Sequence, residues 1–176
     1  MSDYTFDHIY PLKERANLHK GFFLWVWYAD KIPPHIGCSL DGAYFNLKVN
    51  GKEMGLKTDK VLSLIETKKI PTLFIKIGMS IQSNELYEVY NHYQKAATGK
   101  STCLSPITEL FACSSTVFQL SELLKHLANE HKLETVFGLN LADGYSSLPA
   151  YTTVDIDNRL RKLENVKSEK HISPIG

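Results

Sequence analysis

The stretch 33-PPHIGCSLDGAYFNLK-48 decides how the chain folds. It contains two short runs rich in apolar residues, and the pair Asp41-Gly42 separates them. Asp-Gly is favoured in a two-residue type I′ turn, because both central residues of that turn need a positive φ angle. The stretch therefore predicts a β-hairpin in which Leu40 lies opposite Ala43.

This register gives the hairpin two different faces, because successive side chains of a strand point to opposite sides. His35 then lies opposite Lys48, and its face also carries Tyr44 and Asn46. The other face is almost wholly apolar and consists of Ile36, Cys38, Leu40, Ala43, Phe45, Leu47 and Val49. We expect His35 to point away from the aliphatic layer, with Asn46 and Lys48 as its polar neighbours.

Length and composition indicate an ordinary folded protein. The chain has 176 residues, of which 43% are hydrophobic and 22% charged, as expected for one globular domain. We expect an N-terminal extension over residues 1–20, a single α+β domain over residues 21–166 and a flexible tail over residues 167–176. The 20 basic and 19 acidic residues are scattered along the chain, which argues against nucleic acid as a partner.

The cysteines and the apolar segments bear on localisation. Three cysteines form no disulfide-like framework, and the N-terminal residues contain no apolar signal segment, so a cytoplasmic protein is expected. The longest apolar run, residues 21–29, is too short to span a bilayer and is typical of a buried strand.

The rest of the chain alternates strand and helix patterns. Strands are expected at 22–28, 72–77 and 136–141, besides the hairpin, and helices at 59–67, 83–97, 105–112, 116–131 and from 152 or 153 onward. These elements predict an α+β fold in which helices pack on a small antiparallel sheet.

Cys103 is the candidate nucleophile. It precedes a predicted helix in which Ser105 is the N-cap and Pro106 the first helical residue, although Thr102 is an alternative cap. A helix N-terminus favours the thiolate and so lowers the pKa of a cysteine. A cysteine nucleophile also needs a base and a residue that orients the base, and His35 with Asn46 or Lys48 could supply both.

Structural roles remain open for the same residues. A cytoplasmic cysteine is often a small buried hydrophobe, and His35 is equally compatible with an ordinary position in a strand. Cys38 belongs to the apolar face of the hairpin, and Cys113 is an alternative nucleophile near the next helix start. No spacing of metal ligands and no glycine-rich nucleotide loop occurs, so neither a metal nor another cofactor is expected.

The order of these parts resembles the circularly permuted papain-like hydrolases, the NlpC/P60 and lecithin:retinol acyltransferase-like group. The resemblance covers residues 22–112 and depends on P-x-H-I-G at 33–37 and A-x-x-G-K-x-T-C-x-x-P-I-x-E-L-F at 96–111. It implies a permuted papain-like fold and a thiol protease-like hydrolase or acyltransferase. In that site Cys103 is the nucleophile and His35 the base.

The resemblance also implies a third site residue and a range of substrates. Asn46, diagonal to His35, suits the orienting role better than Lys48, because a lysine is a poor partner for an imidazole that becomes cationic. Lys48 and Tyr44 are further candidates for orienting the base or contacting the substrate. The substrate would be a peptide, a lipid ester or an isopeptide-linked modifier.

A non-catalytic interaction protein with the same fold is the alternative. Some of its many aromatic residues would then be exposed anchors for a partner or for a second copy in a homodimer. The candidate anchors are Phe22, Phe23, Trp25, Trp27, Tyr28, Tyr44, Tyr145 and Tyr151.

Overall fold

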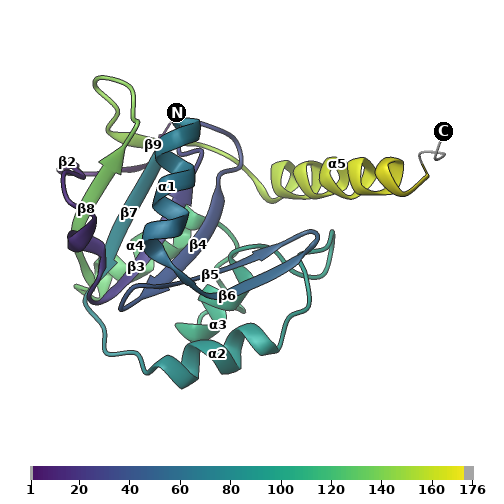
Figure 1. The fold of residues 1–176 in the computed structure, drawn as a ribbon, viewed down its shortest axis with the longest axis horizontal. Helices are drawn as coiled ribbons and strands as arrows, with labels where there is room; N and C mark the ends of the chain where they lie inside the picture. Colours follow the sequence, from purple (N-terminus) through teal and green to yellow (C-terminus); the bar gives the residue numbers. More distant parts are fainter. Residues whose placement is uncertain (1, 173–176) are drawn as a thin grey trace.

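The computed structural model describes residues 2–172 of the chain, and the side chains of residues 4–166. The described part is an α+β fold (Figure 1). Its strands are β1 (Ser2–Thr5), β2 (Tyr10–Pro11), β3 (Phe22–Trp27), β4 (His35–Leu40), β5 (Ala43–Lys48), β6 (Gly51–Lys57), β7 (Thr72–Ile77), β8 (Leu133–Leu139) and β9 (Ser147–Pro149). Its helices are the 3₁₀ helix η1 (Arg15–Leu18) and α1 (Thr58–Lys68), α2 (Ser83–Asn91), α3 (Ser105–Leu110), α4 (Leu120–Asn129) and α5 (Thr153–Ile172).

The main sheet is larger than the expected small antiparallel sheet, and it is mixed. Its seven strands follow the order β2-β8-β7-β3-β4-β5-β6, and β2 runs parallel to β8, while the other neighbouring pairs are antiparallel. β1 and β9 form a separate two-stranded sheet. The N-terminal residues thus add strands to both sheets, and a two-residue strand such as β2 is too short to have a periodic sequence pattern.

The β4–β5 hairpin has the predicted register. Leu40 lies opposite Ala43 and Gly37 opposite Asn46, and the turn residues have φ angles of 47° at Asp41 and 85° at Gly42. The aliphatic face of the hairpin joins the larger of two core clusters, as the alternation predicted. The face that carries His35 is therefore the opposite one.

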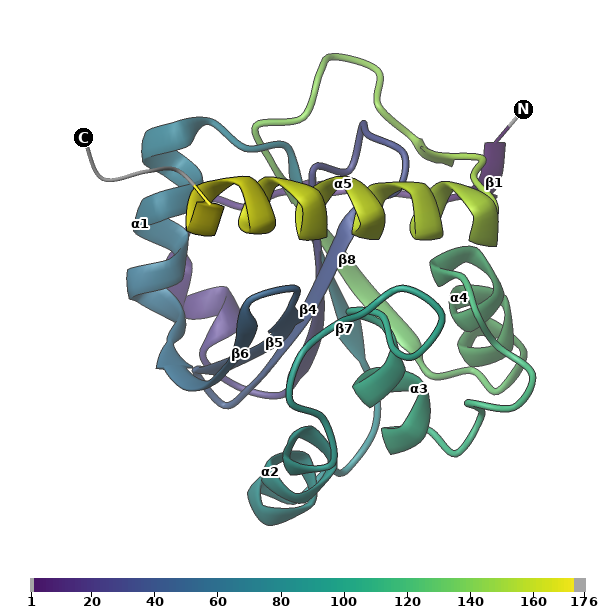
Figure 2. The same cartoon turned by 90° about the vertical axis from the view of Figure 1, so that its right-hand side faces the viewer.

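Helices cover both faces of the main sheet (Figures 1 and 2). α1 lies on one face, where the smaller core cluster includes Trp25, Trp27, Tyr44, Val61, Leu62 and Ile65. α2, α3 and α4 cover the other face, where the larger cluster includes Ile36, Cys38, Phe45, Leu86, Ile107 and Leu123. Most strand side chains are consequently buried on both sides, which explains the nearly continuous apolar run in β3.

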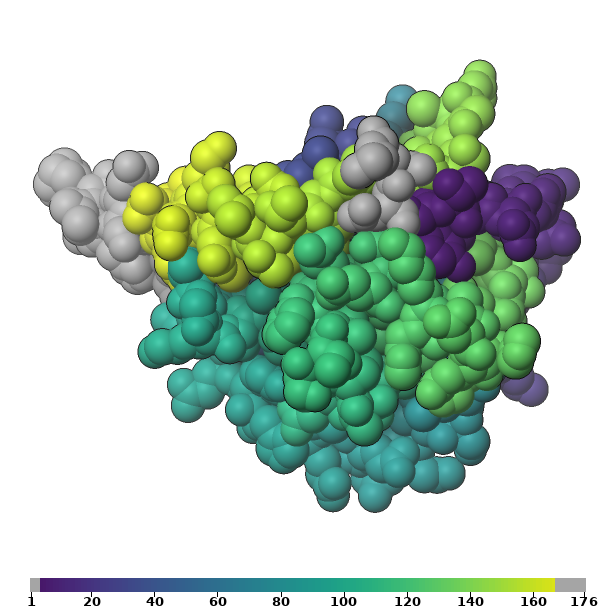
Figure 3. Space-filling model, turned by 180° about the vertical axis from the view of Figure 1, so that it is seen from behind, coloured from purple at the N-terminus to yellow at the C-terminus, as the bar shows by residue number. Residues whose placement is uncertain are grey.

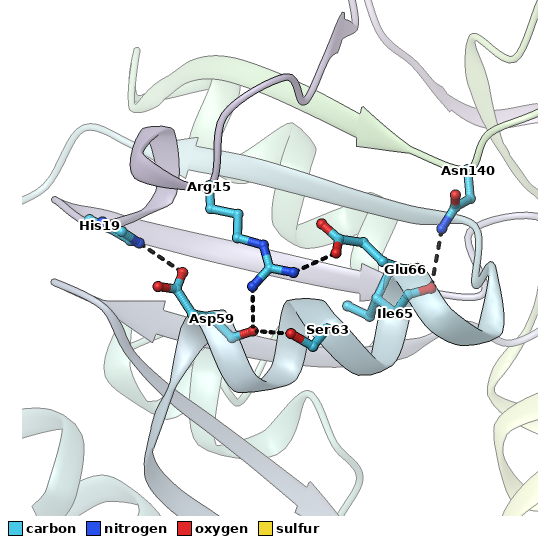
Figure 4. Close-up of polar contacts among 7 residues, drawn as sticks. All are labelled: Arg15, His19, Asp59, Ser63, Ile65, Glu66 and Asn140. Atoms are coloured by element: carbon cyan, nitrogen blue, oxygen red, sulfur yellow. Dashed lines mark hydrogen bonds and ion pairs between the residues drawn. The ribbon is translucent and has the colours of Figure 1, made fainter.

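Polar contacts tie α1 to segments distant in the sequence (Figure 4). The Arg15 guanidinium donates to the carbonyl oxygen of Asp59 at 3.1 Å and forms an ion pair with Glu66. At the other end of the helix, the Asn140 amide donates to the carbonyl oxygen of Ile65 at 3.2 Å. These contacts hold the helix over the Trp25 side of the sheet.

α5 crosses one end of the sheet (Figure 2) and lies against the segment that follows α2 (Figure 3). Leu160 is buried, and the Glu164 carboxylate accepts hydrogen bonds from the Thr98 backbone N–H at 3.0 Å and the Thr98 hydroxyl at 3.1 Å. The helix continues into the predicted tail of residues 167–176, whose last four residues lie outside the described part of the chain. Within the described residues, none of the helices combines the length and the apolar composition that a membrane span requires.

Replacement of Gly37 by alanine should destabilise the protein by about 1–3 kcal/mol, although alanine within a strand is normally more stabilising than glycine. A Cβ at this position would lie 2.4 Å from the Tyr44 hydroxyl oxygen and 2.8 Å from the adjoining ring carbon. Urea unfolding measures the change. In a Tyr44→Leu background the same substitution should cost much less, and an equal cost in both backgrounds would show that the tyrosine is not the cause.

Candidate active site

His35 and Asn46 meet across the β4–β5 hairpin. The Asn46 Nδ2 lies 3.3 Å from the His35 Nε2. Asn46 is buried, with 4% of its surface exposed, and the His35 ring is half-buried. The hairpin register placed both residues on one face, and the structure brings their side chains into contact.

Cys103 lies in the turn that leads into α3. The helix begins at Ser105, with Pro106 as its second residue, so the cysteine precedes the first turn. Within the turn, the Thr102 backbone N–H donates to the Ser105 hydroxyl at 2.8 Å. The backbone N–H of Ile36 donates to the Cys103 Sγ at 3.4 Å. The loop and the first residues of β4 are thus held together through the sulfur.

Cys103 contacts the residue that directly follows His35 in β4. The side chains of His35 and Ile36 point to opposite faces of the sheet, because the two residues are adjacent in a strand. Cys103 packs with the cluster that contains Ile36. The described β4–β5 pairing starts at Gly37, and the Cys103 sulfur contacts β4 one residue earlier, at Ile36. Among the residues that the structure describes, no hydrogen bond joins the sulfur to the imidazole.

Both residues line an open cleft of about 940 Å³. Its walls are the loop before β4, the end of β5, the Cys103 turn and α5, which crosses this end of the sheet in Figure 2. The lining is largely apolar and includes Ile32, Pro33, Pro34, Leu47, Val49, Phe118, Tyr151, Ile156, Leu160 and Leu163. A smaller hollow of about 320 Å³ shares Thr102, Leu104, Phe118 and Ile156 with the cleft.

Burial keeps both groups uncharged at neutral pH. It lowers the pKa of His35 to about 4, with Lys48 and Arg159 acting in the same direction and Glu53 opposing them. Burial also raises the pKa of Cys103 to about 11, and the backbone N–H groups near its sulfur oppose this rise only in part. The expected lowering of the Cys103 pKa by the helix start is therefore wrong, because desolvation of the sulfur is the larger effect.

Three buried polar atoms behind His35 have no hydrogen-bond partner in the described part of the chain. They are Trp27 Nε1, Tyr44 Oη and Asn46 Oδ1. The Trp27 ring centroid lies 6.0 Å from that of Tyr44 and 6.3 Å from that of His35. Burial raises the pKa of Tyr44, and the Asn46 and Trp27 side chains oppose this rise.

Tyr44 and Lys48 differ in their access to the cleft. Tyr44 is fully buried in the smaller core cluster and is not among the residues that line the cleft. Lys48 lines the cleft and forms an ion pair with Glu53 at 2.6 Å. Because its charge lowers the pKa of His35, Lys48 opposes the protonation that an orienting residue would favour.

The other cysteines lie in the core. Cys38 is buried 3.4 Å from the Tyr90 hydroxyl, and burial raises its pKa to about 12. Cys113 is buried, and its thiol donates to the Thr108 carbonyl oxygen at 3.6 Å. Neither lines the cleft. The described residues also contain no group of three or more His, Cys, Asp or Glu side chains that could hold a metal ion.

Two contributors to this site are not identified by sequence patterns. Trp27, a candidate surface anchor, lies beside His35, to which it is paired in the β3–β4 ladder. Arg159 comes from α5, and no sequence pattern indicates that this helix crosses the end of the sheet. The register of β3 against β4 pairs Trp27 directly with His35, and this register is the signal that could have identified Trp27.

Stability should depend on pH through His35. Its pKa is about 4 in the folded protein, against about 6.5 for an unperturbed histidine, so the unfolded chain binds the proton first as pH falls. Between pH 6.5 and 4 the wild type should lose about 2 kcal/mol more than His35→Gln, after an allowance for solvent screening of the half-buried ring. Urea unfolding at several pH values measures this, with His131→Gln as the control, because His131 is exposed. Parallel pH dependences of wild type and His35→Gln would contradict the assignment.

Comparison with known proteins adds no further constraint. No protein-family model matches the chain, and neither a curated protein nor a solved structure matches it. The functional conclusion consequently depends on the geometry of the cleft and on the chemistry of its residues.

Proposed function

We propose that the protein is a cysteine-dependent hydrolase or acyltransferase that acts on an amide or ester. The observation that carries the proposal is the position of the Cys103 thiol and the His35 imidazole on the wall of one cleft. Asn46 contacts the imidazole from behind. A thiol, a base and a residue that orients the base are the groups that nucleophilic acyl transfer requires.

The reaction would proceed through an acyl-enzyme. The Cys103 sulfur forms a bond to the substrate carbonyl carbon while its proton passes to His35. Collapse of the tetrahedral intermediate breaks the C–N or C–O bond, and His35 returns the proton to the leaving group. Water, or an acceptor hydroxyl or amine, then attacks the thioester carbonyl carbon and gives its proton to His35. The C–S bond breaks, the acyl product leaves, and His35 passes the proton to the sulfur, which restores the thiol.

Asn46 would select the tautomer of His35 that this reaction needs. A 180° rotation of the Asn46 amide exchanges Oδ1 and Nδ2 without displacing any other group. Oδ1 then accepts a hydrogen bond from the His35 Nε2–H. This orientation gives a partner to the otherwise unpaired Oδ1 of Asn46. It leaves Nδ1 of His35 as the basic nitrogen.

The resting site is an uncharged pair, so His35 would act as a general base during the attack. Proton transfer requires Nδ1 to approach the thiol to about 3 Å or to reach it through one water molecule, and such contacts commonly tighten when substrate binds. The backbone N–H of Cys103 lies near the sulfur and would donate to the oxyanion of the intermediate.

The order of the elements supports a permuted papain-like fold as part of the same proposal. The candidate base is on β4, its orienting residue is on the next strand, and the nucleophile follows much later, just before a helix. The two adjoining hollows suit a substrate with an arm on each side of the scissile bond.

Cys103 should be alkylated by iodoacetamide faster than Cys38 or Cys113, and His35→Ala should slow this reaction by about tenfold or more. The reason is that only Cys103 lines the cleft beside a base. Mass spectrometry of tryptic peptides at timed intervals gives the three rates, and His19→Ala serves as the matched histidine control. Equally slow labelling of all three cysteines would reject the proposal.

Cys103 can react with iodoacetamide in two ways, with proton transfer to His35 or as a free thiolate. The pH profile of Cys103 labelling should separate these two routes. The route through His35 should be independent of pH above about 4, because the imidazole is already neutral there. The route through free thiolate should rise about tenfold per pH unit up to the thiol pKa of about 11. Wild type should therefore show a plateau followed by a rise, and His35→Ala should show the rise alone. A plateau that survives in His35→Ala would assign the base to another group.

A non-catalytic interaction protein is the second candidate. Most of the expected aromatic anchors are buried, among them Phe22, Phe23, Trp25, Trp27, Tyr44 and Tyr151, and this counts against them as contact residues. Exposed apolar side chains remain at the cleft, namely Tyr28, Ile32, Phe118 and Leu163. A partner that binds the cleft equally well in Cys103→Ser, together with slow labelling of Cys103, would favour this function.

A further inference from the structure

The cleft carries an excess of positive charge. Among its lining residues are Lys31, Lys48, Arg159 and Lys162, and their acidic counterpart in the lining is Asp155. The whole chain is nearly balanced, with a formal net charge of +1. The cations are therefore concentrated at the cleft to a degree that the overall composition does not require.

Some of these charges are already compensated. Lys48 is paired with Glu53 at 2.6 Å, and the Lys31 ammonium lies 3.8 Å from Asp30. The Asp155 carboxylate accepts hydrogen bonds from the backbone N–H of Thr152 at 2.7 Å and from its hydroxyl at 3.1 Å, at the start of α5. These interactions are local and do not extend to the cations farther along the helix.

Arg159 and Lys162 have no ion-pair partner among the residues whose side chains are described. They are three residues apart on α5, so they lie on the same side of the helix. Both line the cleft, as do the apolar residues Leu160 and Leu163 between and after them. Arg159 also lies close enough to His35 to influence its protonation.

We propose that Arg159 and Lys162 bind a carboxylate on the substrate whose carbonyl group is attacked by Cys103. This inference rests on the proposed function. A guanidinium presents two parallel N–H donors that match the two oxygens of a carboxylate, and a neighbouring ammonium adds a third contact. Because the walls of the cleft are largely apolar, the rest of the substrate should also be apolar. The substrate class is thus an acyl compound that carries a carboxylate, such as an acidic peptide.

Two alkylating reagents of nearly equal size test this inference. Iodoacetate and iodoacetamide both form a carbon–sulfur bond with the thiol and release iodide, and they differ in that iodoacetate carries a carboxylate. The ratio of their rates at Cys103, divided by the same ratio for N-acetylcysteine, reports the preference of the cleft for an anion. This normalised ratio does not depend on how reactive the thiol itself is.

The wild-type ratio should exceed one by about three- to tenfold at low ionic strength, and it should fall as salt screens the charges. The double substitution Arg159→Gln with Lys162→Gln should return the ratio to about one. Arg161→Gln is the matched control, because Arg161 is on the same helix but does not line the cleft. It should leave the ratio unchanged.

The outcomes separate this inference from the proposed function. A wild-type ratio of one, or a ratio unaffected by the double substitution, would overturn the carboxylate site even if Cys103 reacts rapidly. Slow labelling by both reagents, with a ratio that still depends on Arg159 and Lys162, would reject the enzyme and support the anion site. Stronger protection of Cys103 by inorganic phosphate than by acetate would overturn the choice of a carboxylate.

Discussion

The register of the β4–β5 hairpin is the constraint on which the site depends. Asp41 and Gly42 both adopt positive φ angles, so the turn fixes which residues face each other along both strands. A shift by one residue would exchange the two faces and would bury His35 in the aliphatic cluster. The same turn therefore positions the candidate base and keeps the hydrophobic core continuous.

Local signals in the sequence predicted the hairpin well, and long-range contacts could not be predicted in the same way. The turn pair and the alternation are short-range features, and they located His35 and Asn46. The Ser105-Pro106 pair located the helix that follows Cys103, although its N-cap is Leu104, and neither Ser105 nor Thr102 caps it. The pairing of β2 with β8 joins segments more than 100 residues apart, and α5 is anchored to Thr98, 66 residues before its partner Glu164. No periodicity within either segment contains that information.

The electrostatics of the site could not be read from the sequence either. Position before a helix suggested an acidic thiol, but the depth of burial determines the sign of the shift, and burial is a property of the folded chain. The same holds for His35, whose cationic neighbours come from β5 and from α5. The sequence identified the two candidate groups, whereas only the packing shows that both are neutral at rest.

The long helix α5 has a consequence for how such a protein could diversify. The groups proposed for bond breaking lie on the sheet and on the turn before α3, whereas the cations proposed to choose the substrate lie on α5. α5 is anchored through a few contacts, among them Leu160 and the Glu164–Thr98 hydrogen bonds. On these proposals, chemistry and selectivity are encoded in separate stretches of the chain. Mutations at the cleft-lining positions of α5 would then change the preferred substrate while the proposed reacting groups stay under independent selection.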